Sequence, residues 1–193
     1  IRRWVNEYAA AIAAVQNLSG REIPAGLKTW GEWARHEAAA ANRQFEYESD
    51  NELHGRIAEL RECFQSEGQV RRIVGQSGVG KTRLALEAFR PPVSAEEEPG
   101  QFALSVGCAY IAHGEAFPRL PHHLSDWARE EVRGTLVVDD CPRDLHRDLA
   151  QEVNRPDNNL NLLTLDYSVE EATEENGIST VWLMDPVSDE VIQ

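Results

Sequence analysis

The sequence is short of lysine and of positive charge in general. Its 193 residues include 33 aspartates and glutamates but only 19 lysines and arginines, so the formal net charge at pH 7 is −14. Lys28 and Lys81 are the two lysines. A protein that binds nucleic acid through the phosphate backbone needs a basic surface, so this balance disfavours nucleic acid as a partner.

Cysteine and long apolar runs are also scarce. The three cysteines, Cys63, Cys108 and Cys141, lack the spacing of a zinc site, and we expect reduced thiols in a cytoplasmic protein. No run of about 18 apolar residues occurs, so we expect no membrane-spanning helix. The sequence opens with Ile1, and its last residues, SDEVIQ, resemble the start of a further helix. We therefore expect it to be a segment of a longer protein.

Residues 1–50 differ in character from the rest. Alanine-rich stretches at 3–16 and 27–45 predict two helices, which SGREIPAG separates. Trp30 and Trp33 are three residues apart, so they share a helical face that we expect to pack on the remaining chain. We interpret residues 1–50 as a helical linker or the end of an upstream domain.

The remaining residues, 51–193, alternate short apolar runs with helical stretches. We predict strands at 69–75, 101–111, 134–140, 159–166 and 178–184, with helical stretches in the connections. This alternation is typical of an α/β domain whose parallel sheet is covered on both faces. Arg71 and Arg72 interrupt the first strand, and we expect them to lie at its exposed end.

One of the two lysines lies in a recognisable motif. Gly75, Gly80, Lys81 and Thr82 satisfy G-x-x-x-x-G-K-[ST], with a predicted strand before the motif and a predicted helix after it. A chance match is expected in on the order of one chain in a hundred of this length, and in fewer when lysine is this rare.

The residue types of the motif suit a phosphate. Glycines let the backbone turn tightly and point N–H groups at phosphate oxygens, and the helix that follows adds its positive end. We expect the Lys81 ammonium to reach the β- and γ-phosphates and the Thr82 hydroxyl to bind Mg²⁺. The predicted nucleotide-binding residues are Gly75, Gln76, Ser77, Gly78, Val79, Gly80, Lys81, Thr82 and Arg83.

An acidic strand end supports the phosphate-binding motif. TLVVDD, residues 135–140, is an apolar strand that ends in two carboxylates. At the carboxyl end of a neighbouring parallel strand, Asp139 faces the same crevice as the loop. We predict that Asp139 holds the Mg²⁺ hydration shell with Thr82, and that Asp140 orients or polarises the attacking water, so that Asp140 and Lys81 are the catalytic residues.

These motifs resemble the STAND class of P-loop NTPases, which includes NACHT and NB-ARC domains, within the AAA+-like branch. GQSGVGKTRLALEAF resembles the phosphate loop of that class, LVVDDC its double-acid strand, and ISTVWLMDPVSDEVI its last strand with the start of the next helix. HGRIAEL, residues 54–60, is similar to the segment that packs around the adenine, which assigns Gly55 and Arg56 to nucleotide binding.

The resemblance implies a three-layer α/β/α fold with a parallel five-stranded sheet of order 5-1-4-3-2. The strand at 69–74 is then central, between those at 160–166 and 178–184. The strands ending at Cys108 and Cys141 become neighbours, which places the two thiols close together.

The sequence also departs from that class. Many relatives carry a basic sensor after the fourth strand, whereas this chain reads LLTLDYS, leaving Thr164 or Asp166 for the role. The lid and winged-helix parts of the class would lie after residue 193. The resemblance therefore implies slow ATP hydrolysis by this segment.

The function that these patterns favour is a nucleotide-dependent switch. Such a module binds ATP or ADP with Mg²⁺ and controls a larger signalling or defence protein, and a prokaryotic antiviral sensor is the role that analogy suggests. The expected partners are the nucleotide, the lid, sensor and effector parts of a longer chain, and further copies in a homo-oligomer. An AAA+-type ATPase with continuous turnover and a scaffold with a structural nucleotide remain as alternatives.

Overall fold

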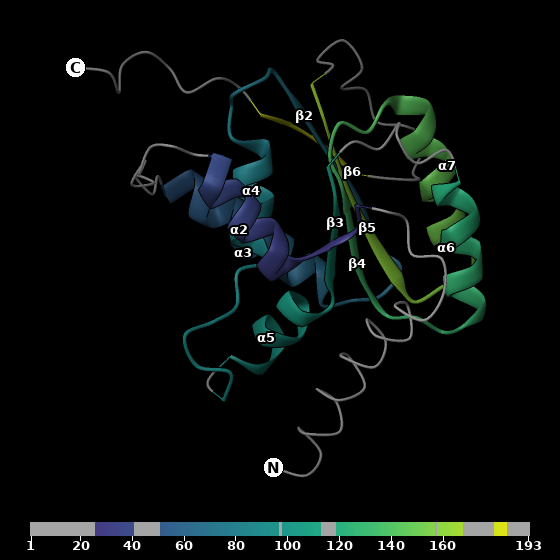
Figure 1. Ribbon diagram of the computed structural model, residues 1–193, viewed down its shortest axis with the longest axis horizontal. Coiled ribbons are helices and arrows are strands. Elements are labelled where there is room, and N and C mark those ends of the chain that lie inside the picture. The colour runs from purple at the N-terminus through teal and green to yellow at the C-terminus, as the bar shows by residue number, and fades with distance from the viewer. Residues whose placement is uncertain are drawn as a thin grey trace.

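The computed structural model describes residues 26–40, 51–96, 98–112, 119–156, 158–167 and 180–184. From β2 to β5, at least one helix separates each described strand from the next (Figure 1). The strands are β1 (Lys28–Thr29), β2 (Val70–Gly75), β3 (Cys108–Ile111), β4 (Gly134–Val138), β5 (Leu160–Asp166) and β6 (Thr180–Met184). The helices are α2 (Trp30–Ala40), α3 (Asn51–Phe64), α4 (Lys81–Ala88), α5 (Pro99–Val106), α6 (Leu120–Arg129) and α7 (Arg143–Val153). The helix predicted at 3–16 lies outside the described residues.

The strands form one sheet of six in the order β1-β3-β4-β5-β2-β6. β2 pairs in parallel with both β5 and β6, which confirms the predicted central place of the first strand. The predicted parallel five-stranded sheet of order 5-1-4-3-2 needs correction, because the sheet has a sixth strand, β1, that runs antiparallel to β3. The two residues of β1 fall inside a stretch predicted as helix, and so short a strand has no alternation that a sequence pattern could reveal.

The segment before β3 also differs from its prediction. Residues 101–111 were expected to form a strand, but Pro99–Val106 is helix α5 and the strand comprises Cys108–Ile111 alone. Proline suits the first turn of a helix, where its missing N–H is not needed. Gln101 then fixes the helix on the core, since its Nε2 donates to the carbonyl oxygens of Ala88 and Arg90.

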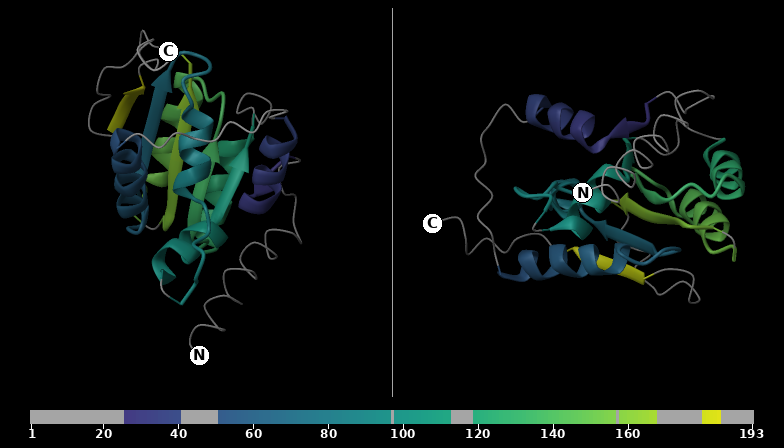
Figure 2. Two further views of the ribbon diagram at one scale, coloured as in Figure 1. Left: turned by 90° about the vertical axis from the view of Figure 1, so that its left-hand side faces the viewer. Right: turned by 90° about the horizontal axis from the view of Figure 1, so that it is seen from below.

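Helices cover both faces of the sheet. α6 and α7 lie on one face, and α2, α3 and α4 lie on the other (Figures 1 and 2). β5 is buried along its whole length, and its side chains alternate between the two layers. Leu163 and Leu165 join the core under α3 and α4, whereas Leu160 and Leu162 join the core under α6 and α7.

The two buried thiols lie apart, contrary to the prediction. Cys108 begins β3 opposite Thr135, near the start of β4, whereas Cys141 follows the other end of β4. Cys108 and Cys141 also belong to different cores. β3 and β4 are neighbours, as expected. However, Cys108 lies at the beginning of β3, whereas it was expected at the end of that strand.

Helix α2 packs on the sheet through its tryptophans, as predicted. Trp33 is fully buried, and Trp30 donates from its Nε1 to the carbonyl oxygen of Leu86 at 3.0 Å. β1 and α2 therefore belong to the same sheet and core as the rest of the described chain. The domain boundary at residue 50 stays a prediction.

Candidate functional site

The loop between β2 and α4 has a backbone that glycine alone adopts without strain. Gly78 has φ 86° and Gly80 has φ 95°, both in the left-handed region. α4 begins directly after this turn, and the N–H of Leu84 donates to the carbonyl oxygen of Gly80 at 2.8 Å. The earlier N–H groups of the helix have no partner within it, so the loop and the helix start together form an anion site.

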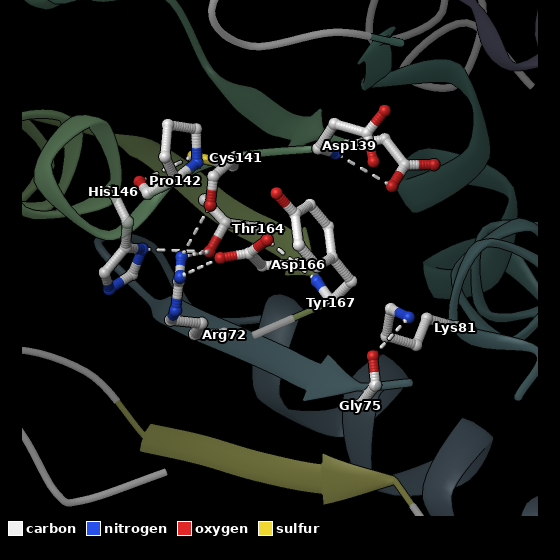
Figure 3. A network of polar contacts seen from close by, with 11 residues as sticks. Arg72, Gly75, Lys81, Asp139, Cys141, Pro142, His146, Thr164, Asp166 and Tyr167 are labelled. Carbon is white, nitrogen blue, oxygen red and sulfur yellow. Dashed lines mark hydrogen bonds and ion pairs between the residues drawn. The ribbon is translucent and has the colours of Figure 1, made fainter. Parts of the chain in front are cut away.

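Lys81 is the first residue of α4, and its side chain contacts the loop. Its side chain donates from Nζ to the carbonyl oxygen of Gly75 at 2.8 Å (Figure 3). It also donates to the carbonyl oxygen of Gln76 at 2.8 Å. The residue is only 9% exposed. Burial lowers the pKa of Lys81, while the carboxylates of Asp139, Asp166 and Asp140 act in the opposite direction. An ammonium has three N–H donors, and the two carbonyls leave one for a phosphate oxygen.

The structure brings Thr82 and Asp139 together. The Thr82 hydroxyl donates to Oδ2 of Asp139 at 2.7 Å. Asp139 directly follows β4, where its N–H donates to the carbonyl oxygen of Ile111 on the neighbouring strand. Oxygen atoms of this kind are what Mg²⁺ prefers, and it usually keeps water and substrate phosphate in its remaining positions.

Tyr110 is a site residue that sequence reasoning missed. Its hydroxyl donates to the same Oδ2 of Asp139 at 3.1 Å. Burial raises the pKa of Tyr110 well above its ordinary value, and the nearby Asp139 carboxylate raises it further, so the phenol stays a donor. No motif contains Tyr110; the parallel pairing of β3 with β4 brings it here.

Asp140 lies next to this contact on an exposed turn. Its φ of 45° is in the left-handed region, which aspartate tolerates better than most residues. Its N–H donates to Oδ1 of Asp139, and the N–H of Cys141 donates to the carbonyl oxygen of Leu165, which ties the turn to β5. The predicted catalytic carboxylate is thus held beside the predicted metal carboxylate.

A buried polar network lies below this turn (Figure 3). Arg72 is 4% exposed and its NH2 group is 2.7 Å from Oδ2 of Asp166. Its other terminal nitrogen donates to the carbonyl oxygen of Cys141 at 3.0 Å and to the Thr164 hydroxyl at 3.5 Å. The Thr164 hydroxyl in turn is 2.9 Å from Nδ1 of His146. The expectation that Arg72 lies exposed was wrong, because a carboxylate on the next strand compensates its charge.

The network also includes the two residues considered for the role of the basic sensor that many STAND proteins carry after the fourth strand. Thr164 and Asp166, the two candidates for that role, both have their side chains engaged with Arg72. Asp166 further accepts the N–H of Tyr167 at its second oxygen. Asp166 occupies the end of β5 as a carboxylate already paired with an arginine.

The remaining predicted residues lie on helices. Arg83 pairs with Glu87 one turn later at 2.6 Å, which is the geometry of a helix-surface residue. Gly55 is exposed and Arg56 half-buried on α3, and this helix packs against α4. Their role around an adenine stays a prediction.

Two further features concern metal and membrane. Among the described residues, no group of three or more histidine, cysteine or acidic side chains is arranged to hold a metal ion. Mg²⁺ at this site would be held by Thr82 and Asp139 together with phosphate and water, the usual ligands of this ion. In the described part of the chain, no helix combines the length and apolar character that crossing a membrane requires.

A separate cavity of about 660 Å³ lies at the amino-terminal ends of the parallel strands, whereas the phosphate loop follows the carboxyl end of β2. Its lining includes Phe64, Leu104, Thr135 and Asn161, and no residue of the loop 75–82. The phosphate loop and this cavity are thus distinct places on the molecule.

No model of a known protein family and no curated protein matches the chain. Similar solved structures include PCH-2 from C. elegans, 13% identical, with a TM-score of 0.43 over 73% of this chain and 44% of that one. Drosophila ORC bound to DNA is 15% identical, with a TM-score of 0.49 over 83% of this chain and 48% of the other. The DnaC helicase loader is 21% identical, with a TM-score of 0.43 over 74% and 95%.

This chain spans less than half of the PCH-2 and ORC chains, at 44% and 48%. Because all three TM-scores lie below 0.5, these likenesses are no guide to what this chain binds. The class follows from the chain itself: a largely parallel sheet, a glycine-rich loop with Lys81 after β2, and Asp139 at the end of β4 make the fold P-loop NTPase-like.

Proposed function

We propose that this chain is a nucleotide-binding module that takes ATP or ADP with Mg²⁺ and acts as a switch in a larger signalling or defence protein of the STAND type. The observation that carries the proposal is the 2.7 Å contact between Thr82 and Asp139, beside a loop whose backbone suits phosphate. Two oxygens from distant parts of the sequence meet where a phosphate-bound Mg²⁺ needs them.

Each residue has a part in this proposal. The backbone N–H groups of 76–82 hold the phosphates, and Lys81 adds the positive charge at the β- and γ-phosphates. Mg²⁺ supplies further neutralisation of phosphate charge when it is bound. Asp140 orients the attacking water and accepts its proton, and Gly55 and Arg56 lie against the adenine.

A switch is favoured over a continuously cycling ATPase by the end of β5. A basic group there would stabilise charge on the transferred phosphoryl group, but Asp166 is a carboxylate neutralised by Arg72. Slow hydrolysis in the isolated segment follows, and the lid, the effector and further copies of the chain complete the protein. A cytoplasmic location accords with the reduced cysteines that we propose.

Removal of the Lys81 side chain provides the test of nucleotide binding. We expect Lys81→Ala to weaken ATP binding by roughly 100-fold, because it removes a charged donor to phosphate. Arg129→Ala removes a surface cation on α6, whose side chain is 73% exposed and pairs with Asp126; it serves as the control and is expected to keep the affinity. Calorimetric titration with Mg²⁺·ATP measures both.

Stability must be followed in parallel, because Lys81 also bonds two loop carbonyls. Thermal denaturation of each variant without nucleotide reports the fold. For the wild type, nucleotide at about 100 times its dissociation constant should add roughly 2.7 kcal/mol to stability. An equal gain in a folded Lys81→Ala variant would contradict the assignment of the loop.

Phosphate release separates the switch from the alternatives. Under the switch proposal, the isolated chain binds and exchanges nucleotide but releases phosphate more slowly than the roughly 1 s⁻¹ at the low end of typical enzymes. Sustained release at or above that rate would favour continuous turnover. Tight nucleotide that neither exchanges nor is hydrolysed would favour a structural cofactor.

A further inference from the structure

The carboxylate of Asp139 receives hydrogen bonds from three different parts of the chain. Oδ2 accepts the Thr82 hydroxyl from α4 and the Tyr110 hydroxyl from β3, and Oδ1 accepts the N–H of Asp140. The bond from Tyr110 differs from the other two, since Tyr110 lies outside both the phosphate loop and the acidic turn. It therefore joins a third segment of the chain to the oxygen that contacts Thr82.

The ring of Tyr110 is itself held by the first described elements of the chain. Trp33 on α2 stacks on it with ring centroids 4.1 Å apart and an interplanar angle of 6°. Lys28 on β1 faces Tyr110 across the antiparallel pair, with its Nζ 5.9 Å from the ring centroid. Both aromatic side chains are buried, Trp33 at 0% and Tyr110 at 3% exposed.

Among the described residues, no hydrogen bond orients the Trp33 indole. The Nε1 of Trp33 is buried and has no hydrogen-bond partner among the described residues, whereas that of Trp30 donates to Leu86. The indole instead lies face to face against the Tyr110 ring. A shift of α2 therefore changes the position of the Tyr110 ring directly.

We propose that Tyr110 is a positioning residue for Asp139 at the metal site, and that its stack with Trp33 couples helix α2 to the Mg²⁺·nucleotide state. This inference rests on the proposed function and extends it. Mg²⁺ on Thr82 favours the orientation of Asp139 that also accepts the Tyr110 hydroxyl. Because coupling between two sites is reciprocal, Mg²⁺·nucleotide then favours the docked position of α2.

Tyr110→Phe isolates the hydroxyl, because it keeps the ring and its stack on Trp33. We expect the Mg²⁺ concentration for half-maximal nucleotide binding to rise about five- to tenfold, which is the effect of one lost bond to a charged group. Nucleotide affinity measured in EDTA should stay unchanged. A merely structural effect of the variant would alter both affinities, so the pair of titrations separates the two explanations.

Ser105→Ala is the matched control. It removes another buried hydroxyl bond, from Ser105 to the carbonyl oxygen of Gln101 on α5. Its Mg²⁺ dependence should equal that of the wild type. An unchanged Mg²⁺ requirement in Tyr110→Phe would overturn the positioning role.

Hydrogen exchange of the amides in α2 tests the coupling. In the wild type, Mg²⁺·ADP should slow this exchange more than ADP with EDTA does. In Tyr110→Phe the extra protection should shrink, and in Trp33→Leu it should be lost. Exchange in α2 that responds equally in all three proteins, or not at all while nucleotide binds, overturns the coupling.

The outcomes also separate this inference from the function beneath it. A wild type that binds no nucleotide in either titration overturns the nucleotide site and this inference together. A wild type that binds Mg²⁺·ADP normally, with no difference in Tyr110→Phe, leaves the nucleotide site standing and overturns the inference alone.

Discussion

At the scale of single residues, Arg72 and Asp166 face each other as full charges with almost no exposed surface, at 4% and 5%. A buried pair of this kind gains little over apolar packing, but losing one partner leaves an uncompensated charge. We expect Asp166→Ala to lower the free energy of unfolding by about 3–5 kcal/mol, measured by urea denaturation.

The control for this prediction lies on the surface. Asp144 pairs with Arg147 at 2.9 Å with its side chain 84% exposed. Asp144→Ala should cost at most about 1 kcal/mol, because exposed pairs contribute little. Similar costs for Asp166→Ala and Asp144→Ala would show that the charge of Arg72 finds compensation elsewhere.

Residue-scale chemistry also predicts how the thiols behave. Burial raises the pKa of Cys141 to about 12 and that of Cys108 well above its ordinary value of 9.0. The folded state therefore keeps protons that the unfolded state loses above about pH 9, so stability is fully present below that pH and falls as the pH rises through the folded pKa values.

Cysteine variants show this effect in the pH dependence of unfolding. We expect the free energy of unfolding to fall between about pH 9 and 11, by at most roughly 1.4 kcal/mol per pH unit for each buried thiol. Cys141→Ala should flatten this decline, as urea denaturation over the pH range would show. An equally steep decline in the variant would assign the loss to other groups.

At the scale of elements, glycines with different backbone angles separate the loop from a helix. Gly78 has φ 86°, and a Cβ there meets no heavy atom within 4 Å, so Gly78→Ala costs only backbone strain, about 1–2 kcal/mol. Gly55 lies in helix α3 without a positive φ and with equally open surroundings. Gly55→Ala should instead stabilise the fold by about 0.5–1 kcal/mol.

Thermal denaturation of the two variants provides the comparison. Opposite signs are expected, since the same methyl group is added in both places and only the backbone angle differs. Nucleotide titration of Gly55→Ala adds a second result, because a methyl group packed against the adenine should weaken binding. Destabilisation by both substitutions would contradict the helical environment of Gly55.

The elements also show what a sequence can and cannot predict. The loop before Lys81 and the acidic turn each depend on a local pattern of residue types, and the structure brings Thr82 and Asp139 from these two segments into contact. The central place of β2 was implied by the family resemblance, and its pairing with β5 and β6 confirms it. Tyr110 and the Arg72–Asp166 pair depend on which strands lie side by side and in what register, which no local pattern contains. Helix α5 was missed because its apolar run suits a strand as well as a helix.

At the scale of the whole molecule, β1 and α2 are integral to a core that the sequence assigned to residues 51–193. Removal of residues 1–50 would uncover Tyr110 and take Trp33 out of its stack. We expect the fragment 51–193 to have a lower melting temperature than the complete chain and a weaker Mg²⁺ dependence of nucleotide binding. Equal values for both proteins would instead support a domain boundary at residue 50.

The antiparallel pairing of β1 with β3 has a consequence for solubility. An uncovered strand edge presents free N–H and C=O groups on which strands of other chains can add. Lys28 and Thr29 occupy these groups on β3, with a charged side chain that discourages further growth of the sheet. So short a strand gives the sheet little rigidity, yet it occupies backbone groups of β3 on which a strand of another chain could otherwise pair.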